Sequence, residues 1–194
     1  MVNQHSLDTI DGQNARSQFI LGRSLFDAPQ EFSLMLARCN YRDLEASIRE
    51  QLSADRQLRQ LWQDHDAQFA VEYYGDIAFD QLITKRQHQG LVFLYLTTQS
   101  TNLEEILSTV FTRLEALGVQ HSCLRGVMVF GLEHVGRLHL SLALLNQVRD
   151  QLSYLLPCPL VLWLTDRGAQ TLFRLAPDVK NWAVTSLQFT WNTA

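Results

Sequence analysis

Short apolar runs alternate with segments of helical period along most of this chain. The apolar runs have strand length and lie at 31–39, 69–74, 91–96, 127–133, 160–166 and 186–191. They contain few polar residues, which is typical of strands buried on both faces of a parallel sheet. The segments between them have helical period and lie at 42–61, 77–87, 102–117, 138–156 and 168–176. This alternation predicts a three-layer α/β/α domain with a mostly parallel sheet.

The first 29 residues differ from the rest of the chain because they are largely polar and lack this rhythm. We expect residues 1–17 to be an irregular, flexible lead-in, and 18–29 to be a short segment that caps the domain. From residue 30 onward no linker-like tract interrupts the alternation, so 30–194 is predicted to be a single α/β domain. A chain of 194 residues also fits one large domain better than two.

The composition and net charge of the chain indicate which kind of partner it binds. Hydrophobic residues make up 46% of the chain and the net charge is −4, so the protein is globular and mildly acidic. It lacks the basic patch that binding to a nucleic-acid backbone requires. No apolar run approaches the roughly 20 residues of a membrane helix, and the N-terminus has no signal-peptide core. We therefore expect a cytoplasmic protein whose partner is another protein, with self-association left open.

The three cysteines are widely spaced and form neither a disulfide framework nor a metal motif. We expect no metal and no cofactor. A nucleophilic cysteine would have to be Cys39, paired with His121 or His134, since all three lie near strand ends. Free cysteine is usually a buried core residue, and a nucleophile needs a base within hydrogen-bond reach. A cysteine-dependent enzyme is therefore one alternative hypothesis.

The loops that follow the strands are the places to look for ligand chemistry in a parallel sheet. After the first strand, a phosphate-binding loop would need glycines, a lysine and a serine or threonine, and none of these is present. Arginine binds phosphate well, so Arg38, Asn40 and Arg42 are weak candidates for an unusual phosphate site, with Glu133 as a metal ligand. A nucleotide-binding protein with a non-classical phosphate site is thus a second alternative.

Several short elements in 127–191 recur in an order that resembles a known family. A strand ends in Gly-Leu-Glu at Glu133, and the next helix carries Asn146 and Arg149. After a Leu-Trp-Leu strand and a further helix come the Ala-Pro-Asp sequence at Asp178 and the nearby Trp182. This pattern resembles a degenerate AAA-like P-loop domain. Such domains precede tetratricopeptide repeats or effector modules in bacterial STAND-type signalling and conflict-system proteins.

The resemblance implies a P-loop-like sheet in which Glu133 stands at the end of the Walker B strand. The run EFSLMLARCNYRDLEASIREQL, at 31–52, is similar to the first strand and helix of the same family. The Walker A residues are missing, so the resemblance does not imply ATPase activity. It implies a non-catalytic interaction or regulatory domain in a bacterial signalling or defence assembly, and the chain is expected to be an excised domain or a standalone relative. For the motif residues themselves we favour structural roles, such as polar contacts at helix ends.

Overall fold

One sheet of six strands forms the centre of the protein. The computed structural model describes residues 4–26, 31–54, 69–74, 90–98, 100, 102–116 and 124–190. The strands are β1 (Leu34–Cys39), β2 (Phe69–Tyr74), β3 (Gly90–Tyr95), β4 (Leu124–Phe130), β5 (Leu160–Leu164) and β6 (Thr185–Phe189). They are ordered β2-β3-β4-β5-β1-β6, and each neighbouring pair is parallel. The predicted parallel sheet is confirmed.

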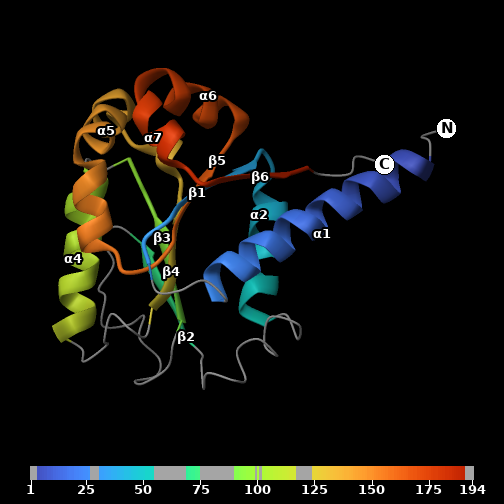
Figure 1. The fold of residues 1–194 in the computed structure, drawn as a ribbon, viewed down its shortest axis with the longest axis horizontal. Coiled ribbons are helices and arrows are strands. Elements are labelled where there is room, and N and C mark those ends of the chain that lie inside the picture. The colour runs from blue at the N-terminus through green and yellow to red at the C-terminus, as the bar shows by residue number, and fades with distance from the viewer. Residues whose placement is uncertain are drawn as a thin grey trace.

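Helices cover both faces of this sheet. They are α1 (Gln4–Phe26), α2 (Arg42–Ala54), α4 (Leu103–Ala116), η3 (a 3₁₀ turn, Leu132–His134), α5 (Leu138–Leu155), α6 (Asp166–Leu175) and α7 (Pro177–Trp182). Figure 1 shows α4 and α5 on one side of the sheet and α1 and α2 on the other. The chain moves one way along the sheet from β3 to β6 and the other way from β1 to β2, and reversed crossovers place their helices on opposite faces. The three-layer α/β/α prediction is confirmed, while the helix expected at 77–87 lies outside the described residues.

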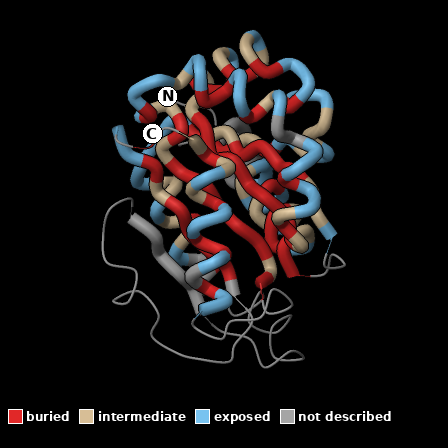
Figure 2. Tube along the Cα trace, turned by 90° about the vertical axis from the view of Figure 1, so that its left-hand side faces the viewer, coloured by how far each residue is buried: buried red, intermediate tan, exposed pale blue. Residues whose placement is uncertain are grey.

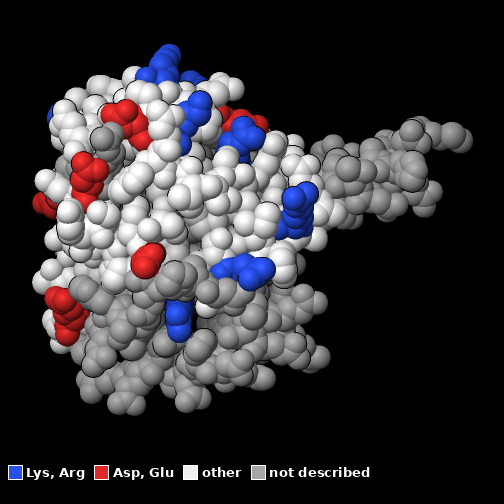
Figure 3. Space-filling model, viewed as in Figure 1, with Lys and Arg blue, Asp and Glu red and all other residues white. Residues whose placement is uncertain are grey.

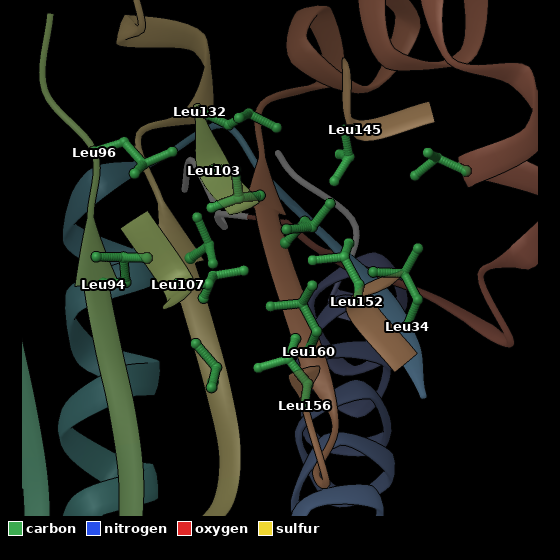
Figure 4. Packing of buried hydrophobic residues seen from close by; sticks show 14 of the residues in the cluster. Leu34, Leu94, Leu96, Leu103, Leu107, Leu132, Leu145, Leu152, Leu156 and Leu160 are labelled. Carbon is green, nitrogen blue, oxygen red and sulfur yellow. The ribbon is translucent and has the colours of Figure 1, made fainter. Parts of the chain in front are cut away.

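Successive strand residues pack alternately into two separate hydrophobic cores, one on each face of the sheet. In β1, Leu34 and Leu36 join the core under α4–α7, whereas Met35 and Ala37 join the core under α1 and α2. Figure 2 shows the buried strands enclosed by helices whose outer surfaces are exposed, and Figure 4 shows the leucines that fill the first core. Each fully buried leucine contributes about 1.5–3 kcal/mol, which explains why the strands are apolar on both faces.

A row of aromatic rings runs across the core under α1 and α2. Ring centroids are 4.8 Å apart for Tyr95 and Phe130, 5.5 Å for Phe130 and Trp163, and 5.2 Å for Trp163 and Phe189. The last pair spans strand β1, which lies between β5 and β6. Ala37 is paired in register with Trp163, and its small side chain leaves room for that contact.

Helix α1 corrects the expectation for the N-terminus. Residues 1–17 were expected to be irregular, and this is wrong from Gln4 onward because Gln4–Phe26 form one helix. The expected packing of the following segment on the domain is correct, since Leu21 and Leu25 are buried against the sheet. No proline occurs before Pro29, and the helix depends on these tertiary contacts more than on an apolar stripe of its own.

The side chains of α1 also cover the outer edge of β6. The Asn14 side-chain amide donates to the Thr190 carbonyl oxygen (2.7 Å), and its Oδ1 accepts from the Thr190 N–H (3.0 Å). The Ser17 hydroxyl donates to the Gln188 carbonyl oxygen at 3.0 Å. Open strand edges are sites of unwanted pairing with other chains, so these contacts close an otherwise available edge.

Candidate functional site

The carboxyl ends of β1 and β5 meet where the chain reverses direction along the sheet. Helix α2 leaves β1 toward one face and α6 leaves β5 toward the other, so a crevice can open between the two strands. Open parallel sheets usually bind ligands at such a point. Arg38 lies near the end of β1, Asn40 follows that strand, and Asp166 follows β5. The structure therefore brings the sequence candidates to the expected location, which we call the carboxyl edge.

Asn40 and Asp166 form a two-point clamp across this edge. The Asn40 amide donates to Asp166 Oδ2 at 2.8 Å, and Asn40 Oδ1 accepts from the Asp166 backbone N–H at 2.8 Å. Arg38 lies beside them, with one guanidinium nitrogen donating to Gln188 Oε1 at 2.9 Å and another 3.7 Å from Asp166. Both candidate ligands thus bond to other parts of the protein.

The N-terminus of α6 points into the same edge and carries its own acceptors. Thr165 caps the helix, and its hydroxyl accepts from the Gly168 N–H at 3.0 Å. Glu133 Oε1 accepts from the Thr165 N–H at 3.0 Å. A Cβ on Gly168 would lie 3.3 Å from the Thr165 hydroxyl oxygen and 3.6 Å, an ordinary contact distance, from the Glu133 carboxyl group. Together with Asn40, these oxygens occupy the place that a bound anion would take at a helix N-terminus.

A carboxylate that sequence reasoning missed lies close to Glu133. The pKa of Glu45, in the first turn of α2, is raised from 4.5 to about 7. Burial is the largest cause and the charge of Glu133 adds to it, whereas Arg49 and Arg42 lower the pKa. Glu133 Oε2 is buried without a hydrogen-bond partner among the described residues. An acid three residues into a helix is a common capping residue, so its position in the sequence gave no functional signal.

Arg42 and Cys39 have partners other than those expected. The Arg42 guanidinium contacts His134 Nε2 at 3.1 Å. The Cys39 thiol donates to the Tyr41 carbonyl oxygen at 3.3 Å, and burial raises the pKa of this thiol. His121 lies outside the described residues. The thiol therefore stays protonated at neutral pH, and His134 is engaged by an arginine.

The motif residues of the second half form another clamp, between α5 and α7. Asn146 Oδ1 accepts from the backbone N–H groups of Asp178 (3.1 Å) and Val179 (3.2 Å), and its amide donates to Asp178 Oδ2 at 3.0 Å. Asn146 thus caps α7 from a neighbouring helix, which satisfies donors that Ala176 at the N-cap does not. The side chain of Arg149 lies outside the described residues.

Trp182, the last of the motif residues, packs against the fold. Its ring stacks on Phe32 with centroids 4.7 Å apart, beside the core under α4–α7. The aromatic position therefore has a structural contact that accounts for it, as Asn146 and Asp178 do.

The described residues contain neither a metal-binding cluster nor a membrane-spanning helix. Within those ranges, no group of three or more histidine, cysteine, aspartate or glutamate side chains is arranged to hold a metal ion. No helix in the same part of the chain is long and apolar enough to cross a membrane.

The fold and the site together define the class to which the protein belongs. It is a three-layer α/β/α protein with a parallel sheet, whose carboxyl-edge side chains bond largely to one another. No known protein family matches the chain, and no curated protein matches it.

Proposed function

We propose that this protein is a non-catalytic interaction or regulatory domain with a P-loop-like fold. The setting implied by the resemblance is a bacterial signalling or defence assembly in which the domain contacts another protein. One observation carries the proposal: at the carboxyl edge, Asn40, Thr165 and Glu133 supply the acceptors that surround the start of α6. A phosphate group would have to displace them.

Such displacement is unfavourable. The two hydrogen bonds between Asn40 and Asp166 lie at the surface, and a typical hydrogen bond contributes about 0.5–1.5 kcal/mol net. A phosphate entering beside Asp166 would separate it from Asn40 and would place two negative charges close together. Enzymes keep their catalytic groups within reach of the substrate, whereas these groups are held by their neighbours.

The surface of α5 supports a role in protein contacts. Leu140 and Leu144 lie one helical turn apart and are 47% and 39% exposed, with exposed Ala143 between them. Single exposed leucines are ordinary, but an adjacent pair supplies apolar area that a protein partner can bury.

The decisive experiment separates catalysis from contact. Purified protein is incubated with ATP and magnesium, and phosphate release is followed over many equivalents of enzyme; we expect no turnover. Turnover that is lost in Glu133→Gln would contradict the proposal and would favour the rival nucleotide site, whose supporting observation is the unpartnered Glu133 Oε2.

The contact itself is tested with a matched pair of variants. Once a partner has been identified, its affinity is compared for the wild type, for Leu140→Ser with Leu144→Ser, and for Gln151→Ser. Gln151 is exposed on the same helix and serves as the control. We expect at least about a tenfold loss for the double variant and none for the control, since one apolar anchor carries more than about 1.4 kcal/mol. Equal affinities would remove α5 from the interface.

A further inference from the structure

A groove of about 640 Å³ lies between α1 and β6. Its polar lining includes Gln13 and Arg16 from α1, Arg38 from β1, and Ser186 and Gln188 from β6. This volume falls within the range of small-molecule sites, which is about 300–1,000 Å³. The groove is therefore large enough for a small organic ligand.

The charge of the groove has one sign. The charged residues among its described lining are Arg16 and Arg38, and none of that lining is acidic. The described part of α1 from residue 12 onward contains two arginines and no acid. In Figure 3, basic side chains lie along the described part of α1. A locally positive groove on a protein of net charge −4 attracts anions.

The two arginines retain donors for a ligand. No described residue forms a hydrogen bond or ion pair with the Arg16 guanidinium, which is exposed on α1. Arg38 has five N–H donors, of which one is bonded to Gln188. Its Nε is buried without a partner in the described structure, and its contact with Asp166 is long at 3.7 Å. Asp166 offsets part of the Arg38 charge, so Arg16 supplies the uncompensated positive charge.

From these observations we propose that the groove between α1 and β6 binds an oxyanion carried by a small molecule, either a phosphate ester or a carboxylate. Guanidinium groups match both anions because they donate two parallel hydrogen bonds. Gln13 and Ser186 add neutral donors beside the charged pair. The site differs from the phosphate site first considered at Arg38, Asn40 and Arg42, because Asn40 and Arg42 face other partners.

The proposal is tested by calorimetric titration of the full chain with three probes: inorganic phosphate, adenosine monophosphate and succinate. We expect saturable binding of at least one probe without added metal. Binding of the phosphates assigns a phosphate ester as the ligand, and binding of succinate alone assigns a carboxylate. Absence of saturable binding by all three overturns the proposal.

Two variants locate the binding. Arg16→Gln removes an exposed charge that has no partner within the described protein, so the variant is expected to fold. It should weaken binding at least about tenfold, because charge-assisted hydrogen bonds are among the stronger ones. The matched control is Arg23→Gln, on the same helix, where the guanidinium lies 5.9 Å from the Phe19 ring centroid and outside the groove lining. Equal binding in the wild type and Arg16→Gln places the anion elsewhere and refutes the inference.

This inference is independent of the proposed interaction role. If the probes do not bind, the proposed contact through α5 still stands. If no partner binds at α5, the proposed anion site in the groove still stands. Binding that depends on Arg16 and needs no magnesium also separates the groove from any nucleotide site at Glu133.

Discussion

Replacing Glu45 by glutamine should change how the stability of the protein depends on pH. The Glu45 carboxyl is partly buried at the start of α2, and it lies close enough to Glu133 for that charge to raise its pKa. Arg49 and Arg42 oppose the shift but do not cancel it. Glutamine keeps the shape and the hydrogen-bonding capacity of the side chain and removes its ionisation.

The magnitude follows from the pKa in the two states. A rise from 4.5 to about 7 corresponds to at most about 3.5 kcal/mol, at about 1.4 kcal/mol for each pKa unit. The side chain keeps some contact with water, which screens its interactions, so we expect about 1–2 kcal/mol. The folded state binds the proton more tightly than the unfolded state. The contribution of the Glu45 carboxyl to the wild-type free energy of unfolding is therefore fully present below pH 4.5. It is lost as the pH rises toward 7.

Urea denaturation between pH 4.5 and pH 8 measures this difference. Relative to wild type, Glu45→Gln should gain about 1–2 kcal/mol over that interval. Glu50→Gln is the matched control, because Glu50 is exposed on the same helix. The reasoning is refuted if the wild type and Glu45→Gln keep a constant difference. A wild type that gains relative stability with rising pH would show that Arg49 and Arg42 dominate.

Three other perturbations test separate parts of the structure. Asn40→Ala should lower the free energy of unfolding by about 0.5–1.5 kcal/mol in urea, because it removes two solvent-exposed hydrogen bonds to Asp166 at the start of α6; a change near zero would show that the clamp is replaced by water. Gly131→Ala should lower the melting temperature by more than Gly12→Ala does, since Gly131 has φ 75° and Gly12 has open space around it. Equal effects would contradict that strain. Alkylation of Cys39 at neutral pH should be slower than that of free cysteine, because burial raises the pKa of the thiol; a faster reaction would support the cysteine-dependent alternative.

Hydrophobic periodicity predicted the strands and helices well where burial decides the pattern. The strand at 69–74 and the helix near 102–117 correspond to β2 and α4. Strand β4 begins at Leu124 instead of residue 127, because Arg125 and Gly126 interrupt the apolar run. A Cβ at Gly126 would overlap the end of the Leu25 side chain, which would have to move. Leu25 lies about one hundred positions earlier in the chain, so no local sequence pattern contains this contact.

The sequence indicated where the candidate residues lie in the fold, but it did not indicate their hydrogen-bond partners. Topology brings the ends of parallel strands together, so Arg38, Asn40 and Glu133 were found near one edge. Asp166, the partner of Asn40, lies 126 positions from it along the chain, and the pairing depends on β1 and β5 being neighbours. Glu45 was missed because its altered pKa arises from burial that appears only when α2 packs on the sheet.

Three asparagines, at positions 14, 40 and 146, each join two elements by hydrogen bonds to both ends of the side-chain amide. The residues they join are 176, 126 and 32 positions apart. Contacts of this kind need the strands and helices that they connect to be in place, so we expect them to form late in folding. Interactions absent from the folding transition state slow unfolding without speeding folding. We therefore expect the three amides to lower the unfolding rate more than they raise the folding rate.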